Sequence, residues 1–232
     1  MNPEIIHTAS FPIDGAKLIL DSGRAAIAER GLFRIALSGG HTPAAVYRQW
    51  SATAGDLQWD RVQITFGDER CVPPDDEQSN YRMARESLLD HVPIPPGNIF
   101  RMKGEAPPDE AASSYEAQLA AVASRLGEAR YRHDLVLLGV GPDGHTASLF
   151  PGTAALEEQT RNVVANFVPK FNTYRITFTY PLINAARHVC FMASGDDKKG
   201  VVGQILAGQG DYPSGRVKPT DGKVTWLLGW PG

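Results

Sequence analysis

The apolar run at residues 134–138 constrains the fold of this chain more than any other segment. It reads Asp-Leu-Val-Leu-Leu, shows no alternation of polar and apolar residues, and ends at Gly139 and Gly141. A strand that is apolar on both faces is typical of a parallel sheet whose two faces are both covered. The run therefore predicts a buried strand in an α/β protein.

The remainder of the chain alternates between short apolar runs and helix-like stretches, as expected of a parallel sheet. Further strands are predicted at 33–38, 62–66, 162–167, 175–180, 188–193 and 224–228. Helices are predicted at 11–31, 43–54, 79–91, 110–126 and 197–207, the first stopped by Gly31 and the second capped by Thr42. Residues 92–108 contain five prolines and are expected to form mostly loop. We expect a single domain over residues 1–232, with a mainly parallel, Rossmann-like sheet flanked by helices on both faces.

Composition and charge exclude several classes of protein. The chain has 232 residues, is 42% hydrophobic and carries a net charge of −3. This balance is unlike that of a protein that binds nucleic acid by neutralising phosphates. No apolar run reaches the roughly 18 residues that a membrane span needs. The N-terminus does not resemble a signal peptide, and Cys71 and Cys190 lie far apart, so a cytoplasmic protein, with a monomer as the default, is expected.

The segment Ser38-Gly39-Gly40-His41-Thr42-Pro43 joins a predicted strand to the start of a helix. Two glycines allow a ligand to approach the backbone closely, and the free N–H groups of a first helical turn attract anions. The segment lacks the Gly-Lys-Ser/Thr of a Walker loop. Anion binding and an ordinary tight turn are both open on this segment alone.

Charged residues follow the predicted strand 62–66 directly, in the sequence Gly67-Asp68-Glu69-Arg70. Two carboxylates and a guanidinium at a strand end can position hydroxyl groups and stabilise developing negative charge. Surface salt-bridge clusters of this composition are common, however. Local sequence alone favours a surface cluster here over a site.

The segment 139–145 contains a literal G-x-G-x-x-G, the pattern of a dinucleotide-binding loop. That loop opens a long helix, whereas Pro151 interrupts this chain soon after Gly144. We therefore expect no nicotinamide cofactor. The loop instead presents Asp143 and His145, a carboxylate that could fix the tautomer of an imidazole and an imidazole that could accept a proton. The histidines show no H-x-x-x-H pair, so no metal is expected.

Together, these segments resemble the 6-phosphogluconolactonase family, within the wider glucosamine-6-phosphate isomerase/6-phosphogluconolactonase superfamily. The matching blocks are 37–43 (LSGGHTP), 67–73 (GDERCVP), 79–81 (SNY), 138–151 (LGVGPDGHTASLFP), 175–177 (RIT) and 194–198 (SGDDK). They span nearly the whole chain in order, and the fourth block is highly specific. The chain is therefore identified as a member of this superfamily.

The resemblance implies hydrolysis of 6-phospho-D-glucono-1,5-lactone without a metal or an organic cofactor. It implies that His145 is the general base and that Arg70 helps to stabilise the oxyanion. The residues that it places around the sugar phosphate are Ser38, Gly39, Gly40, Thr42, Asp68, Arg175 and Lys198.

Two alternatives remain open at this stage. The first is glucosamine-6-phosphate deaminase activity, but deaminases resemble Asp-Glu-Tyr where this chain has Asp68-Glu69-Arg70. They also supply a glutamate soon after the histidine, whereas no carboxylate follows His145 before Glu157. The second alternative is a non-catalytic sugar-phosphate sensor, which we would expect to carry a helix-turn-helix that is not evident in this sequence.

Overall fold

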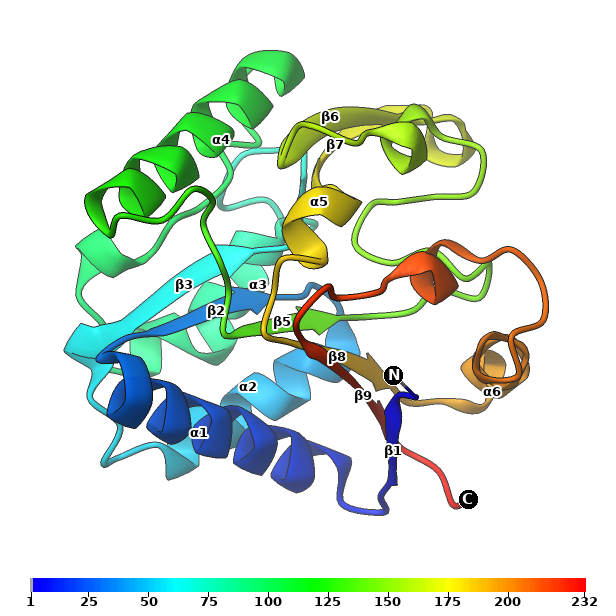
Figure 1. Cartoon of the computed structure of the whole chain (residues 1–232), viewed down its shortest axis with the longest axis horizontal. Coiled ribbons are helices and arrows are strands. Elements are labelled where there is room, and N and C mark those ends of the chain that lie inside the picture. Colours follow the sequence, from blue (N-terminus) through cyan, green and yellow to red (C-terminus); the bar gives the residue numbers. More distant parts are fainter. Residues whose placement is uncertain (1) are drawn as a thin grey trace.

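A computed structural model describes residues 2–232, and its central feature is a sheet of six parallel strands (Figure 1). In spatial order these are β1 (Glu4–His7), β9 (Lys223–Leu228), β8 (His188–Ala193), β5 (Leu135–Leu138), β2 (Phe33–Leu37) and β3 (Val62–Phe66). The fold class predicted from the sequence is thus confirmed.

The predicted central strand, β5, lies between β2 and β8 and is fully buried. Its register aligns Leu135 with Ile35 of β2, and Val136 with Val189 of β8. Successive β5 residues point into different layers, since Leu137 belongs to one hydrophobic cluster and Leu138 to the other. The unbroken apolar run is explained by this two-sided burial.

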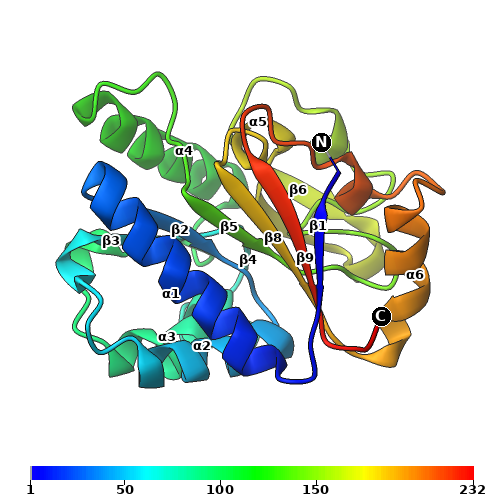
Figure 2. The same ribbon diagram turned by 60° about the horizontal axis from the view of Figure 1, so that its bottom comes forward.

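Helices cover both faces of the six-stranded sheet (Figure 2). One face packs against α1 (Phe11–Arg30), α2 (His41–Thr53) and α3 (Asn80–Ser87). The other face packs against α4 (Pro108–Arg125), α5 (Tyr180–Ile183) and α6 (Asp196–Leu206). No helix within residues 2–232 is long and apolar enough to cross a membrane.

A second sheet of three antiparallel strands was not predicted. It consists of β4 (Asp68–Arg70), β7 (Thr173–Phe178) and β6 (Val163–Val168), in that order. The predicted strand 175–180 is wrong at its C-terminal end, because Tyr180 already begins α5. This small sheet lies beside α4 in Figure 1 and brings the Asp68–Arg70 segment next to residues about a hundred positions later in the chain.

Two predicted helix boundaries also differ from the structure. Helix α2 begins at His41 with Gly40 as its N-cap, so the predicted cap at Thr42 is wrong. The Thr42 hydroxyl instead lies 3.0 Å from the Ser194 hydroxyl, on the loop before α6. The helix predicted over 79–91 ends at Ser87 and continues as a short 3₁₀ turn.

Two buried histidines form hydrogen bonds with threonines of the six-stranded sheet. His133 is completely inaccessible to solvent, and its Nε2 lies 2.8 Å from the Thr65 hydroxyl. His188 on β8 is also buried, and its Nε2 lies 2.8 Å from the Thr225 hydroxyl. Burial lowers the pKa of His133 to about 3 and that of His188 to about 4. Both imidazoles are therefore neutral in the folded protein at pH 7.

These histidines predict that acid destabilises the fold. Between about pH 6.5 and the folded pKa, the unfolded chain binds a proton that folded His133 does not, so the free energy of unfolding falls as the pH falls. Each such histidine contributes a slope of about 1.4 kcal/mol per pH unit. Urea unfolding of His133→Gln should give a shallower fall between pH 6.5 and 4.5 than the unchanged chain, whatever the variant's stability at pH 7. Parallel pH dependences would contradict this account.

Candidate active site

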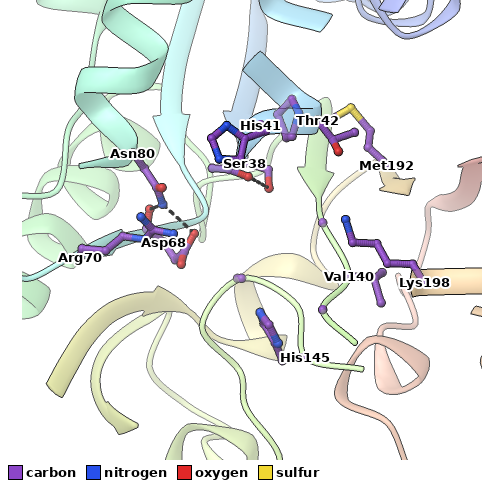
Figure 3. Close-up of a pocket in the computed structure, with 16 residues that line it drawn as sticks. Ser38, His41, Thr42, Asp68, Arg70, Asn80, Val140, His145, Met192 and Lys198 are labelled. Carbon is purple, nitrogen blue, oxygen red and sulfur yellow. Dashed lines mark hydrogen bonds between the residues drawn. The ribbon is translucent and has the colours of Figure 1, made fainter. Parts of the chain in front are cut away.

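The principal candidate site is a pocket at the carboxyl ends of β2 and β5, where the connections of the sheet diverge. The chain leaves β2 towards the neighbouring edge strand β3, whereas it leaves β5 towards β8 on the other side. Ligands of open α/β sheets bind in the crevice at such a switch point. The pocket is lined by Ser38, Gly39, Gly40, His41, Thr42, Pro43, Asp68, Arg70, Asn80, Gly139, Val140, Gly141, His145, Ala147, Met192 and Lys198 (Figure 3).

A buried tyrosine fixes the turn that follows β2. The Tyr47 hydroxyl accepts a hydrogen bond from the Ser38 N–H at 2.8 Å and donates one to the Ser38 carbonyl at 2.9 Å. Tyr47 is completely buried, and this burial raises the pKa of its hydroxyl well above the ordinary value. The hydroxyl thus stays protonated and holds the backbone of Ser38 at the pocket.

The second residue of the turn, Gly39, is pressed against the side chain of Asn80. A Cβ at Gly39 would lie only 2.0 Å from Asn80 Oδ1, so no other residue fits there without displacing Asn80. The Asn80 amide is itself held in place, because it donates hydrogen bonds to the Asp68 carbonyl at 2.9 Å and to Asp68 Oδ1 at 3.1 Å. Asn80 therefore contacts both the glycine turn and Asp68 of β4, and holds the two next to each other.

The two carboxylates that follow β3 have different environments. Glu69 is buried and accepts hydrogen bonds from the N–H groups of Arg70, Asn80 and Tyr81 at 2.7–2.8 Å, and from the Ser79 hydroxyl at 3.1 Å. It therefore anchors the first turn of α3. Burial raises the pKa of Glu69, although these N–H groups oppose the shift.

Asp68, in contrast, lines the pocket. Its Oδ2 accepts a hydrogen bond from the Ser148 hydroxyl at 2.6 Å, and its side chain is almost completely buried. The surface salt-bridge cluster favoured by the local sequence is thus wrong for both carboxylates. The reason is the pairing of β4 with β7, which covers a segment that reads as an exposed turn.

Two arginines lie next to each other on the small sheet without a carboxylate partner. Arg70 of β4 and Arg175 of β7 are opposite each other in the strand register. Arg70 donates a hydrogen bond to the Gln78 carbonyl, and among residues 2–232 neither guanidinium forms an ion pair. Burial, and then the charge of Arg70, lower the pKa of Arg175. Arg70 lines the pocket, whereas Arg175 does not; its guanidinium carbon lies 5.4 Å from the centre of the Phe171 ring.

A third cation without a carboxylate partner is Lys198 of α6. Figure 3 shows it on the opposite side of the pocket from Asp68 and Arg70. Its Nζ donates a hydrogen bond to the Ser194 carbonyl at 3.3 Å, and it forms no ion pair within the described part of the chain. Arg70 and Lys198 thus line one cleft, and neither is paired with a carboxylate in the described part of the chain. Positive charges of this kind favour the binding of an anion.

His145 and Asp143 form a hydrogen-bonded pair in the loop after β5. His145 Nδ1 lies 2.5 Å from Asp143 Oδ1, and the Asp143 pKa falls to about 2 because the hydrogen bonds from His145 and Lys170 outweigh the effect of burial. An ionised carboxylate can only accept hydrogen bonds, so Nδ1 carries the proton and Nε2 of the neutral ring has a free lone pair. This tautomer is the one that a general base needs.

Packing fixes the plane of the imidazole. The His145 ring stacks on Phe150 with ring centroids 4.0 Å apart and an interplanar angle of 23°. The ring also lies close to Gly141. A Cβ at Gly141 would lie 2.0 Å from the His145 Cε1, so only glycine leaves room for the ring at this position. Among the glycines of this loop, Gly141 is thus the one that makes room for the histidine ring. No α-helix follows the loop directly, in agreement with the rejection of a dinucleotide fingerprint.

The structure brings most of the predicted site residues to one pocket. The predicted residues that line it are Ser38, Gly39, Gly40, Thr42, Asp68, Arg70, His145 and Lys198. Asp143 and Arg175 do not line the pocket. Asp143 is hydrogen-bonded to His145, and Arg175 is opposite Arg70 in the strand register. Sequence reasoning did not single out Asn80 or Tyr47; Asn80 lies in the Ser-Asn-Tyr block, which was the only signal for it. No group of three or more metal-ligating side chains occurs within residues 2–232.

Comparison with known proteins shows which proteins this chain resembles in sequence and fold. A 6-phosphogluconolactonase of Synechocystis is 44% identical over 207 residues, covering 88% of this chain and 84% of its own length. The structure of a 6-phosphogluconolactonase from Thermotoga maritima superposes with a TM-score of 0.85 at 27% identity and covers 98% of this chain and 99% of its own. A monomeric glucosamine-6-phosphate deaminase shares the fold alone, with a TM-score of 0.78 at 19% identity over 97% of this chain and 96% of its own.

Residues 8–226 match the family described as glucosamine-6-phosphate isomerases/6-phosphogluconolactonase, which is nearly the whole chain. The chain therefore belongs to the glucosamine-6-phosphate isomerase/6-phosphogluconolactonase family.

Proposed function

We propose that this protein hydrolyses 6-phospho-D-glucono-1,5-lactone to 6-phospho-D-gluconate, a step of the oxidative pentose phosphate pathway. The observation that carries the proposal is the pocket itself, in which a histidine held as a base faces a glycine turn and cations that have no carboxylate partner. The similarity to 6-phosphogluconolactonases over most of the chain supports the same activity.

The phosphate end of the substrate fits the side of the pocket formed by the turn after β2. The backbone N–H groups at the start of α2 and the ammonium of Lys198 suit a dianionic phosphate. We assign phosphate binding to Ser38, Gly39, Gly40, Thr42 and Lys198, with Arg175 adding positive charge from behind Arg70. Fixing the phosphate would hold the carbonyl at a set distance from the base.

The carbonyl end fits the side that holds His145 and Arg70. His145 Nε2 takes a proton from a water molecule whose oxygen attacks the lactone carbonyl carbon. The carbonyl oxygen becomes an oxyanion, which the guanidinium of Arg70 stabilises. When the carbonyl re-forms, the bond from the carbonyl carbon to the ring oxygen breaks and the ring oxygen takes the proton back from the imidazolium. The product acid then ionises.

Asp143 has an orienting role in this scheme. Its carboxylate holds the Nδ1–H and stabilises the imidazolium that forms during the reaction. Asp68 is the carboxylate available to the sugar hydroxyls, since Glu69 is occupied at the start of α3. The lactone is an activated ester, so this machinery requires neither a metal nor an organic cofactor.

Glucosamine-6-phosphate deaminase activity is the second candidate, because the fold is shared. Ring opening of an amino sugar needs an acid near the histidine. In this chain the polar side chains that follow His145 form hydrogen bonds within the protein. The Thr146 hydroxyl donates to the Gly139 carbonyl at 2.9 Å, and the Ser148 hydroxyl donates to the Asp68 carboxylate. This chain thus presents no carboxylate at that position, which favours the lactonase.

We further propose that residues 1–232 act as one monomeric, cytoplasmic unit. Both cysteines are free, with Cys190 buried, as is usual in a reducing compartment. The acidic net charge of −3 argues against a nucleic-acid partner.

Removal of the base should abolish most of the activity. We expect His145→Ala to fold normally and to lose about 10²- to 10⁴-fold in kcat, the usual range for a general base. The measurement is acid release from freshly generated lactone with the spontaneous rate subtracted, and glucosamine 6-phosphate is tested in parallel for ammonia release. His91→Ala, an exposed histidine bonded to the Glu86 carbonyl away from the pocket, is the control. Near-full turnover by His145→Ala would remove His145 from the mechanism.

Removal of the phosphate cations should weaken binding more than chemistry. Lys198→Ala should raise KM and the inhibition constant of 6-phosphogluconate by about ten- to a hundredfold, since a hydrogen bond to a charged group contributes about 1.5–3 kcal/mol. Arg175→Ala should raise both constants by a smaller factor, because Arg175 does not line the pocket. Lys199→Ala is the matched control, because Lys199 is the next residue of α6 but pairs with Asp196 at 2.7 Å. Inhibition that is unchanged in both variants would refute the assignment.

A further inference from the structure

One charged group touches the His145–Asp143 pair from a distant part of the chain and has no place in the scheme above. Lys170 donates a hydrogen bond from Nζ to Asp143 Oδ2 at 3.0 Å, on the carboxylate oxygen that His145 does not use. It lies in the short 3₁₀ turn Pro169–Phe171 that joins β6 to β7. The turn of the small antiparallel sheet therefore contacts the carboxylate partner of His145.

The turn that carries Lys170 is anchored beside the base through its aromatic neighbour. Phe171 packs edge-on against Phe150 with ring centroids 5.7 Å apart, and Phe150 is the ring that stacks on His145. Lys170 and Phe171 thus contact the two partners that orient the imidazole, the carboxylate and the aromatic ring.

We propose that Lys170 is a positioning residue for the general base: it holds Asp143 in the orientation that receives the His145 Nδ1–H and offsets part of the carboxylate's negative charge. The inference rests on the proposed function, since it assigns a role within the same reaction. Asp143 then has a fixed partner on each oxygen, and the imidazole has one preferred orientation.

The offset of charge has a direction that can be measured. A carboxylate beside a neutral imidazole favours its protonation, and an ammonium on the same carboxylate reduces that effect. The other charged or titratable groups around His145 are His41 of α2, Asp68 and Arg70 of β4, and Lys198 of α6, all of which line the pocket. None of them contacts Asp143, so a change at Lys170 isolates the effect on this carboxylate.

The test compares the pH dependence of kcat/KM in Lys170→Met, Lys170→Arg and the unchanged chain between pH 5.5 and 7.5. In Lys170→Met we expect the acidic limb of the profile to move about half a unit towards higher pH, with kcat/KM at pH 6.5 reduced about two- to threefold, because a half-exposed ion pair couples weakly. KM should stay unchanged. Lys170→Arg should restore both the limb and the rate.

Lys17→Met is the matched control, because it also removes a lysine–aspartate pair, the one with Asp21 on α1, far from the pocket. An acidic limb that does not move in Lys170→Met overturns the proposal, including the case of a uniform loss at every pH, which would indicate a merely structural contact. His145→Ala is assayed in the same series. Its full activity would overturn the proposed base and the role of Lys170 together, whereas an inactive His145→Ala with an unmoved limb in Lys170→Met would overturn the role of Lys170 alone.

Discussion

The pairing of β2 with β5 determines where this protein can bind a ligand. These parallel strands are neighbours in the sheet, but the chain leaves them in opposite directions, so their terminal loops separate and open a crevice. The turn after β2 and the histidine loop after β5 form opposite walls of the pocket, and a Cβ at Gly139 would lie 3.6 Å from the Ser38 hydroxyl. The turn that we propose to bind phosphate and the histidine that we propose as the base are thus held at a fixed separation by buried strands of the sheet.

Burial around this crevice separates structural from chemical roles among similar residues. Asp68 and Glu69 are adjacent, yet Glu69 is bonded to the start of α3, while Asp68 faces the pocket. Arginines near the sheet also differ in their partners. Arg34 forms an ion pair with Glu128, whereas Arg70 and Arg175, which are opposite each other on the small sheet, form no ion pair within residues 2–232. A surplus of positive charge in a partly buried cleft is costly without an anion, and the substrate provides one.

Much of this arrangement could be predicted from the sequence, because it depends on local signals. The apolar run of β5, the glycines after β2 and the Asp-Gly-His segment are three separate signals, and each is made of residues that are near neighbours in the sequence. The small sheet could not be predicted, since β4 is only three residues long and entirely charged, and it becomes a strand only by pairing with β7. The separate roles of Asp68 and Glu69 depend on contacts with Ser148 and with the start of α3, and Lys170 reaches Asp143 from the β6–β7 turn. These are contacts between distant parts of the chain, so no local pattern indicates them.

The orientation of the substrate between the two walls is the central claim, and a crystal structure with bound 6-phosphogluconate tests it most directly. The account predicts the phosphate on the Ser38–Thr42 turn within hydrogen-bond reach of Lys198, and the carboxylate beside His145 Nε2 and Arg70. A product bound in the reverse direction, with its phosphate at His145, would contradict the assignment of the base and of the phosphate-binding turn.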